Sequence, residues 1–432
     1  MALAAMTPLL RLLPLLLLLL HPSLREYLTV SRRPNGELHP IVLLAGQGCS
    51  DLEARLTEAY RPSIPRCGAM KGKGWFSLWG NASDLLAHDY VQCFEEQMRL
   101  VYDPAANDYR NLPGVETRVP KFGSARGFRD KNPSHPKRCN DHVREALEGL
   151  GYRDGDTLFG APYDWRYAPP IPSQSSRAYS HYFRQFKELV EAASKKHHKK
   201  VIIFGHSYGG MVALEFVRNM PPAWRNRYIK HLILAAPTLS TGFVYQVYGL
   251  RSAGSLQAIY VPTTDDSSVM MMWSSFEIAI ASLPSPSVWG HEPIVITEQR
   301  NYSAYDMEDL LAAFGLADSV EPFRRRMVPK MLCSKAPMVP ITLINGVDNM
   351  TPRQLVFWDG DYNASPEIVY GDGDGGINLI SMTAFEADMC QQPRQKQQFK
   401  SVKIPKVGHT ELVTDARAVK EVVEEILEAN RL

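Results

Sequence analysis

Short apolar runs alternate along this chain with longer segments whose apolar residues recur at helical spacing. Strands are predicted at 40–44, 201–204, 231–235, 340–344, 366–370 and 401–406, and helices at 142–150, 184–193, 307–314 and 416–429. A further helix is expected from Asp51, because Leu52, Leu56 and Ala59 would share one helical face. Strands that alternate with helices predict a mostly parallel sheet with helices on both faces.

Two stretches interrupt this alternation. The chain is aromatic and irregular between Cys67 and Cys93, and between Pro237 and Lys335 proline, serine, methionine and aromatic residues replace the regular pattern. Long stretches of this kind are typical of insertions that cover a site. The pattern predicts one α/β domain over residues 36–432, with a lid insertion at 62–125 and a cap insertion at 238–335.

The amino terminus has the pattern of a targeting segment. Leucines fill positions 15–20, and this apolar run is too short to span a bilayer comfortably. We expect residues 1–24 to be a signal peptide or, since no clean cleavage motif follows, a retained signal anchor. Sequons compatible with the secretory pathway begin at Asn81, Asn301, Asn349 and Asn363. The expected location is lumenal, vacuolar or extracellular, with membrane association as an open alternative.

Composition excludes some classes of function. The chain has 432 residues, 45% hydrophobic and 22% charged, with a formal net charge of +2. These values predict a globular protein with a large core and give no reason to expect nucleic-acid binding. The basic run at 195–200 is expected to be the solvated end of a helix. No cysteine spacing matches a zinc site, and neither a metal nor a cofactor is expected.

The pentapeptide Gly205-His206-Ser207-Tyr208-Gly209 carries the strongest chemical signal. It follows the apolar run 201–204 and precedes a segment of helical character. A G-x-S-x-G sequence between a strand and a helix is the nucleophile elbow of the α/β-hydrolases, in which a sharp turn lifts the serine hydroxyl above the sheet. We therefore expect Ser207 to be a nucleophile and the fold to be that of the α/β-hydrolases.

A nucleophilic serine needs a histidine base, and the base needs a carboxylate partner. His409 follows the last predicted strand and precedes the final helix, where the base of this fold belongs. Asp348 and Asp374 both follow strand-like runs and precede His409. The residues themselves leave the choice between these two aspartates open.

Acyl transfer also needs hydrogen-bond donors for the oxyanion. One is normally the main-chain N–H after the nucleophile, which belongs to Tyr208 here, and the other comes from the loop after an early strand. Gln47, between Gly46 and Gly48, fits the second position. Main-chain groups suffice, so the side chains at these positions carry little information.

The chain has six cysteines, and an oxidising compartment would allow some of them to pair. Cys67 and Cys93 bracket an aromatic segment and are the best candidates, Cys333 and Cys390 are a weaker pair, and Cys49 and Cys139 are expected to be free. Within the bracket, we expect Trp75, Phe76 and Trp79 to contact a lipid surface rather than the core.

Several linked motifs resemble the lecithin:cholesterol acyltransferase family, which includes lysosomal phospholipase A2 and phospholipid:diacylglycerol acyltransferase. They are Leu52–Leu56, Gly160–Arg166, Gly205–Gly210, Asn301–Asp306 and Gly371–Gly375. Residues 113–120 are similar to the plant lecithin-cholesterol acyltransferase-like 1 group in particular. The resemblance extends from about Pro40 to His409, which is nearly the whole chain after the leader.

The resemblance implies roles for individual residues. It assigns the acid to Asp374, and it agrees with Ser207, His409 and the N–H groups of Gln47 and Tyr208. It also implies a lid tied by Cys67 and Cys93, with Trp79 as the lid tryptophan. The family commonly has leucine where Tyr208 stands, and Trp-Gly-Gly where residues 238–240 read Thr-Leu-Ser. These departures surround the acyl pocket and bear on substrate choice.

The resemblance also implies an activity. We expect a serine-dependent enzyme that takes an acyl chain from a glycerophospholipid and passes it to an alcohol, such as a sterol or diacylglycerol, or to water. Its expected partners are a phospholipid, an acyl-acceptor lipid and a membrane or lipid-particle surface, while the residues say nothing about protein partners. The alternatives are a plain phospholipase or lipase without transferase activity and an inert lipid-binding protein.

Overall fold

The computed structural model describes residues 38–79, 91–128, 139–251, 266–333 and 335–432. The predicted leader and the sequon at Asn81 lie outside these residues. Of the remaining sequons, Asn301 and Asn363 are exposed. Asn349 is half-buried, and its Nδ2 donates to the carbonyl oxygens of Val347 and Val407. Asn349 is therefore the least accessible acceptor of the three.

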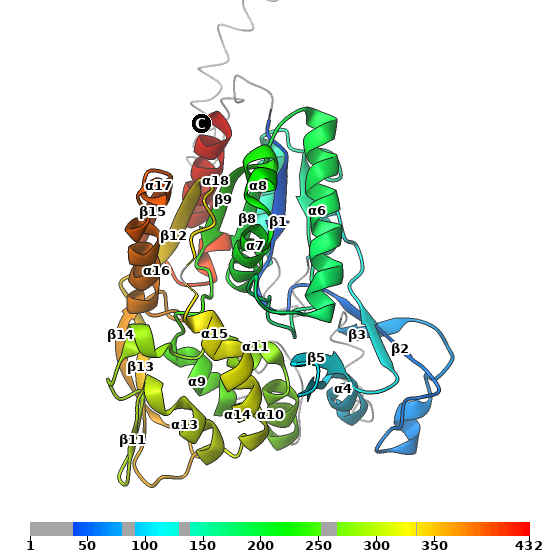
Figure 1. Cartoon of the computed structure of the whole chain (residues 1–432), viewed down its shortest axis with the longest axis vertical. Helices are drawn as coiled ribbons and strands as arrows, with labels where there is room; N and C mark the ends of the chain where they lie inside the picture. Colours follow the sequence, from blue (N-terminus) through cyan, green and yellow to red (C-terminus); the bar gives the residue numbers. More distant parts are fainter. Residues whose placement is uncertain (1–37, 80–90, 129–138, 252–265, 334) are drawn as a thin grey trace, which may run out of the picture.

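A six-stranded parallel sheet forms the upper part of the molecule in Figure 1. Its order is β15 (Phe399–Pro405), β12 (Ile341–Val347), β9 (Ile229–Ala235), β8 (Val201–His206), β1 (Ile41–Leu44) and β7 (Leu158–Gly160). In a parallel sheet the carboxyl ends of all strands share one edge. The loops that follow β1, β8 and β15 therefore meet at that edge.

Helices cover both faces of this sheet. Alternate side chains such as Val42 and Ile203 pack on one face, and Leu43 and Phe204 pack on the other. The first face is covered by α6 (Arg177–His197), α7 (Tyr208–Asn219), α8 (Pro222–Tyr228) and α16 (Leu379–Gln391), and the second by α5 (Asp141–Gly149) and α18 (Ala416–Arg431). The short α17 (Pro393–Lys396) precedes β15. The predicted α/β-hydrolase fold is confirmed.

The predicted lid range, residues 62–125, supplies strands to two small antiparallel sheets, and the first sheet also contains one strand from before this range. The first has the order β3 (Phe76–Trp79), β2 (Leu52–Leu56) and β6 (Val115–Arg118), and a hairpin joins β4 (Leu100–Asp103) to β5 (Asp108–Asn111). Helix α4 (Val91–Met98) and a 3-10 turn, η1 (Pro65–Gly68), complete the described part of this region. The helix expected from Asp51 is wrong, because Leu52, Ala54 and Leu56 are buried while Glu53 and Arg55 are not, which is the period of a strand.

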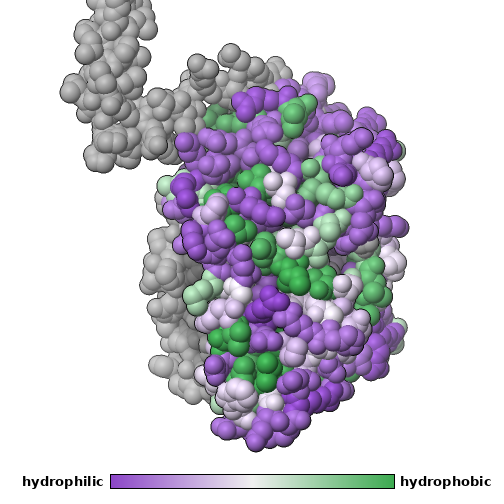
Figure 2. Space-filling view, turned by 90° about the vertical axis from the view of Figure 1, so that its left-hand side faces the viewer, coloured by the Kyte–Doolittle hydropathy of each residue, from purple (hydrophilic) through white to green (hydrophobic). Residues whose placement is uncertain are grey.

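The predicted cap range, residues 238–335, is mainly helical and lies below the sheet in Figure 1. Its helices are α9 (Val244–Arg251), α10 (Asp266–Ser274), α11 (Glu277–Ala281), α12 (Pro286–Trp289), α13 (Met307–Ala313), α14 (Val320–Pro322) and α15 (Val328–Met331), with a π-helical turn, η6 (Phe323–Met327). A second sheet lies beside them in the order β11 (Asn301–Tyr302), β10 (Val295–Thr297), β13 (Asn349–Phe357) and β14 (Glu367–Gly373). The strand predicted at 366–370 therefore lies outside the central sheet. On the side of the molecule where this second sheet lies, the surface mixes hydrophilic and hydrophobic residues (Figure 2).

Two disulfides are present among the described residues. Cys67 is bonded to Cys93, as predicted. The expectation for the other cysteines is wrong, because Cys49 is bonded to Cys139 while Cys333 and Cys390 are free thiols. The Cys49–Cys139 bond joins the loop after β1 to the start of α5 across 90 residues of sequence, a separation that local patterns do not reveal.

Candidate active site

Ser207 occupies the sharp turn between β8 and α7. Its backbone has φ 55° and ψ −127°, a strained conformation for a residue with a side chain. The two glycines that flank the turn are required by space. A Cβ at Gly205 would lie 2.5 Å from the carbonyl oxygen of Gly209, and one at Gly209 would lie 2.5 Å from that of Ala45. The turn therefore has the geometry of a nucleophile elbow.

His409 lies beside Ser207, although 202 residues separate them in the chain. It follows β15 and precedes α18, and its Nε2 is 2.8 Å from Ser207 Oγ. Its Nδ1 is 2.8 Å from Asp374 Oδ2. When the Nδ1 proton is directed at the carboxylate, Nε2 is free to accept the hydroxyl proton.

Asp374 directly follows β14, and its side chain is fully buried. Its second oxygen, Oδ1, accepts the N–H groups of Gly376 and Ile377 at 2.9 and 2.6 Å. These bonds fix the carboxylate plane so that Oδ2 faces His409. Asp348, the alternative acid, is exposed, and its main-chain N–H donates to Oδ1 of Asp372. The structure thus brings Asp374, rather than Asp348, to the histidine.

Tyrosine hydroxyls hold the two segments that carry the candidate oxyanion donors. Tyr208 begins α7, and its hydroxyl donates to the carbonyl oxygen of Tyr167 at 3.1 Å. The hydroxyl of Tyr163 donates to Ala45 at 2.8 Å, just before Gln47. A Cβ added to Gly46 would lie 3.1 Å from Ser207 Cβ, so this loop touches the candidate nucleophile. The N–H groups of Gln47 and Tyr208 therefore stand on segments that contact or adjoin Ser207.

His206 is a second histidine at the site, which sequence reasoning missed. It is buried, and its Nε2 lies 3.0 Å from the carbonyl oxygen of His409. Burial, together with the nearby His409, lowers the pKa of His206 to about 3. A neutral His206 can donate its Nε2 proton to this carbonyl and so hold the segment of His409. In the sequence, the only indication of a role for His206 was its place at a variable position of the G-x-S-x-G motif.

The three lid aromatics differ in their surroundings. The expectation that Trp79 contacts a lipid surface is wrong for this structure, because the ring is fully buried between Phe94 and Trp165. Its Nε1 donates to the carbonyl of Gly48 at 2.8 Å, which joins β3 to the loop of Gln47. Trp75 and Phe76 are partly exposed, and Phe76 also packs against the core, contrary to the expectation.

Trp75 has two cationic neighbours. The guanidinium of Arg55 lies 5.0 Å from the centre of its ring and that of Arg118 lies 4.4 Å away. Each arginine also pairs with a carboxylate, Arg118 with Glu53 at 2.6 Å and Arg55 with Glu116. This surface is therefore aromatic and charged rather than purely apolar.

A buried ion pair connects part of the predicted lid range to the loop that follows β7. Arg166 is fully buried, and its Nη2 lies 2.6 Å from Asp164 Oδ2. The same guanidinium donates to the side chains of Asn111 and Thr117 and to the carbonyl of Met98. Through these hydrogen bonds, the ion pair holds α4, β5 and β6 against the loop that follows β7.

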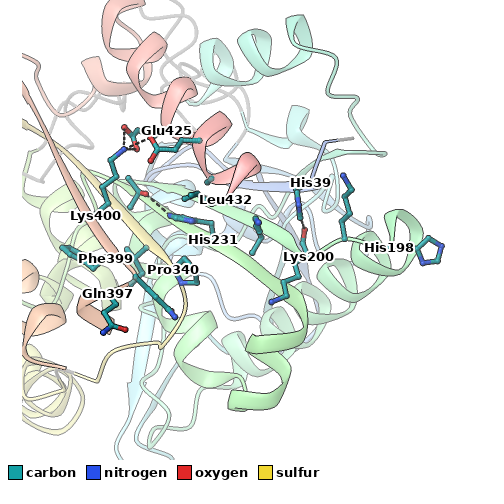
Figure 3. A pocket seen from close by; sticks show the side chains of 17 residues that line it. His39, His198, Lys200, His231, Pro340, Gln397, Phe399, Lys400, Glu425 and Leu432 are labelled. Atoms are coloured by element: carbon teal, nitrogen blue, oxygen red, sulfur yellow. Dashed lines mark hydrogen bonds and ion pairs between the residues drawn. The ribbon is translucent and has the colours of Figure 1, made fainter. Parts of the chain in front are cut away.

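A cavity of about 710 Å³, shown in Figure 3, lies away from these groups. It is lined by Lys200 and Pro340, which directly precede β8 and β12. Ser207 directly follows β8, so the whole length of that strand separates the cavity from Ser207 and from the His409 and Asp374 side chains beside it. Within the cavity, Lys400 is already paired with Glu425 and Glu428 at 2.7 and 2.8 Å. Because of its distance from Ser207, this cavity is not the site of acyl chemistry.

The sheet, its covering helices and the serine at the strand–helix turn define an α/β-hydrolase. A chain of the solved Tle4–Tli4 complex matches this one with a TM-score of 0.55 at 13% sequence identity, covering 91% of this chain and 99% of that chain. At such an identity the likeness shows the fold alone. Among the described residues, none of the helices is both long enough and apolar enough to cross a bilayer.

Sequence comparison identifies the family. The family model for lecithin:cholesterol acyltransferase matches residues 75–321. Lecithin-cholesterol acyltransferase-like 1 of Oryza sativa subsp. japonica is 40% identical over 398 residues, which is 91% of this chain and 87% of that protein. Lysosomal phospholipase A and acyltransferase of Homo sapiens is 29% identical over 416 residues, covering 94% and 93%. The chain belongs to the lecithin:cholesterol acyltransferase family.

Proposed function

We propose that this protein is a serine-dependent lipid acyltransferase and phospholipase, and that Ser207, His409 and Asp374 are its catalytic triad. The supporting observation is the position of the His409 ring, with one nitrogen 2.8 Å from Ser207 Oγ and the other 2.8 Å from Asp374 Oδ2. The family membership supports the general reaction class, since relatives are named as acyltransferases and as a phospholipase.

The first half-reaction acylates the enzyme. Ser207 Oγ attacks the ester carbonyl of a glycerophospholipid while His409 Nε2 takes the hydroxyl proton. The N–H groups of Gln47 and Tyr208 stabilise the tetrahedral oxyanion. His409 then gives its proton to the departing lysophospholipid oxygen, and the acyl chain remains on Ser207. Asp374 keeps the imidazole oriented and stabilises its positive charge throughout.

The second half-reaction removes the acyl chain from Ser207. An alcohol acceptor, such as a sterol or diacylglycerol, or a water molecule loses its proton to His409 and attacks the acyl ester. The bond between the acyl carbon and Ser207 Oγ then breaks, and His409 returns the proton to Oγ. The human relative is named as both a phospholipase and an acyltransferase. The balance between them depends on how far the cap excludes water from the acyl-enzyme.

We place this reaction at a membrane or lipid-particle surface in the secretory pathway. The two disulfides support an oxidising compartment. The surface around Trp75, with the cations of Arg55 and Arg118 beside it, supports contact between the lid region and phospholipid head groups. With Trp79 buried, Trp75 is the tryptophan we assign to this contact.

The experiment incubates purified protein with labelled phospholipid vesicles, with and without a sterol or diacylglycerol, and identifies the labelled products. We expect a lysophospholipid together with an acylated acceptor, and free fatty acid when no acceptor is present. Ser207→Ala should abolish every product while vesicle binding remains. Free fatty acid under all conditions would reduce the activity to that of a phospholipase, and full turnover by Ser207→Ala would overturn the proposal.

A further inference from the structure

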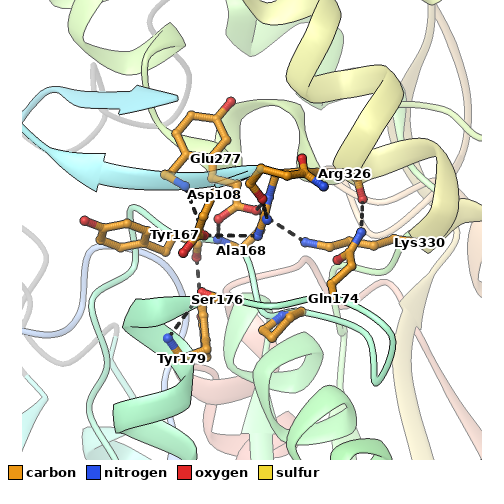
Figure 4. A network of polar contacts seen from close by, with 12 residues as sticks. Asp108, Tyr167, Ala168, Gln174, Ser176, Tyr179, Glu277, Arg326 and Lys330 are labelled. Carbon is orange, nitrogen blue, oxygen red and sulfur yellow. Dashed lines mark hydrogen bonds and ion pairs between the residues drawn. The ribbon is translucent and has the colours of Figure 1, made fainter. Parts of the chain in front are cut away.

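A buried cluster of charges lies in the cap, outside the triad (Figure 4). Glu277, the first residue of α11, is fully buried, and its Oε1 lies 2.7 Å from the Nε of Arg326, which is also fully buried. Lys330, on α15, points at the same oxygen from 3.6 Å. Two cations thus face one carboxylate oxygen, and the other oxygen, Oε2, is directed elsewhere.

That second oxygen holds a single peptide group of the main domain. Glu277 Oε2 accepts the N–H of Ala168 at 3.0 Å. The carbonyl of the same peptide belongs to Tyr167, and it accepts the hydroxyls of Tyr208 at 3.1 Å and Tyr179 at 3.3 Å. The peptide between residues 167 and 168 is therefore held on one side by the cap and on the other by α6 and α7.

The connection between the cap and this loop is reinforced beside the peptide. The N–H of Ile278, which follows Glu277 on α11, donates to the carbonyl of Arg166 at 3.2 Å. Arg326 donates through Nη1 to the carbonyl of Ser175 at 3.3 Å. Because buried polar groups must find partners, these bonds leave the loop little freedom to move independently of the cap.

Tyr208 transmits this constraint to the reacting centre. It directly follows Ser207, its side chain is buried, and its N–H is the proposed oxyanion donor. An oxyanion donor is effective only when it lies about 2.7–3.1 Å from the position of the oxyanion. A shift of the first turn of α7 by a fraction of an ångström would therefore change the reaction rate.

We infer that Glu277 is a positioning residue for the oxyanion donor, acting through the 167–168 peptide and the hydroxyl of Tyr208. This inference rests on the proposed acyl transfer. Leucine, which the family commonly has in place of Tyr208, carries no hydroxyl, so the connection depends on a residue in which this chain departs from the family pattern. Glu277 touches neither Ser207 nor His409 in the contacts described above and acts at a distance.

A purely structural role for Glu277 is the competing explanation. Buried ion pairs often contribute little net stability, but removing one partner leaves a buried charge and is strongly destabilising. A useful variant must therefore preserve charge balance. In a Lys330→Met background, Glu277→Gln removes one negative charge from a cluster that has already lost one positive charge. Lys330→Met alone retains the contact between Glu277 and Arg326 and serves as the reference.

The experiment measures kcat and KM on a soluble short-chain ester, with kcat normalised to the concentration of serines that react with a fluorophosphonate. Four proteins form a double-mutant cycle, and all of them carry Lys330→Met. One has no further change, one adds Glu277→Gln, one adds Tyr208→Phe, and one adds both substitutions. We expect each added substitution to lower kcat about tenfold with little change in KM, which is less than the 10²–10³ loss seen when an oxyanion donor is removed entirely. The protein that carries both should be no slower than either, because both act through one peptide.

Tyr182→Phe is the matched control. Its hydroxyl is buried and donates to the carbonyl of Ala161 at 2.8 Å, so it loses a comparable bond elsewhere. In the Lys330→Met background, its normalised kcat should stay within about twofold of the reference.

Values of kcat within twofold of the reference for both substitutions, or effects that multiply in combination, would overturn the inference. If the Glu277 variant yields no reactive serine, an unchanged kcat for Tyr208→Phe decides against the inference and a tenfold loss decides for it. These outcomes are distinct from a failure of the proposed function, in which Ser207→Ala remains active.

Discussion

Asp374 and His409 are joined twice. The carboxylate Oδ2 lies 2.8 Å from His409 Nδ1, and the main-chain carbonyl of Asp374 accepts the N–H of His409 at 2.7 Å. The main-chain bond places the histidine segment against the turn that follows β14, and the side-chain bond then sets the angle of the ring.

Replacement of Asp374 by Asn should therefore retain the fold and lose the activity. The amide can present an N–H to Nδ1 and so favour the wrong tautomer, and we expect kcat to fall by about three to four orders of magnitude. Asp348→Asn is the matched control, and it should stay within about twofold because Asp348 makes no described contact with His409. Steady-state kinetics on a soluble ester measure both, and the reverse order of effects would reassign the acid.

Two buried histidines should make stability sensitive to acid. Burial is the main cause that lowers the pKa of His206 to about 3 and that of His231 to about 4. Between these values and the ordinary 6.5, the unfolded chain binds protons that the folded chain does not, so the free energy of unfolding falls as pH decreases. At pH 5 the loss is about 2 kcal/mol for each histidine.

Chemical denaturation at pH 7 and pH 5 tests this sensitivity. His206→Gln can still donate to the carbonyl of His409 and should reduce the difference between the two pH values by about 2 kcal/mol. His181→Gln changes an exposed histidine of α6 and controls for the substitution itself. An undiminished difference in His206→Gln would show that folding does not lower the pKa of His206.

Lys330 should destabilise the folded chain at neutral pH. Burial is the largest cause that lowers its pKa from 10.5 to about 8. Between pH 8 and 10.5 the unfolded chain holds the proton and the folded chain does not, so the free energy of unfolding rises with pH across this window. At pH 7, Lys330→Met should be more stable than the wild type by up to about 3 kcal/mol, with a smaller gain above pH 9.

Urea unfolding at pH 7 and pH 9.5 measures this gain. Lys195→Met, which replaces an exposed lysine of α6, should not reproduce it. A loss of stability for Lys330→Met at pH 7 would mean that its attraction to Glu277 outweighs the cost of burying its charge.

Removal of each disulfide should affect lipid binding and ester hydrolysis to different extents. Cys67–Cys93 ties η1 to α4 in the lid region, so replacing both cysteines by serine should weaken vesicle binding more than hydrolysis of a soluble ester. Cys49–Cys139 ties the loop of Gln47 to the start of α5, and its removal should lower hydrolysis of the soluble ester as well. Vesicle flotation and ester kinetics on the two double variants test this contrast, and equal losses in both assays would indicate general misfolding instead.

The site residues whose positions depend on short contiguous segments could be predicted from the local sequence. Ser207 was predictable because a strand, a glycine-flanked turn and a helix are contiguous. His409 was predictable from its place between the last strand and the last helix. Asp374 and Asp348 could not be separated in this way, because the choice depends on how the turn after β14 meets the loop after β15, and only three-dimensional packing decides that.

The remaining differences have the same origin. Leu52–Leu56 satisfies a helical spacing and a strand alternation at once, and its pairing with β3 and β6 selects the strand. Trp79 closely follows the partly exposed Trp75 and Phe76 in sequence, but its ring packs between Phe94 and Trp165. Cys49 meets Cys139 only because β1 and α5 are adjacent in the fold. Local sequence patterns give no information about contacts between segments that are distant in the chain.

The most direct test of the central claim is to locate the acyl group during turnover. Purified protein is mixed with phospholipid vesicles, quenched in acid within the first turnover, digested and mapped by mass spectrometry. We expect a fatty-acyl mass on Ser207 in the peptide that contains residues 205–209, absent from Ser207→Ala. Sustained turnover with no acyl group on Ser207, or with the acyl group on another residue, would contradict the account.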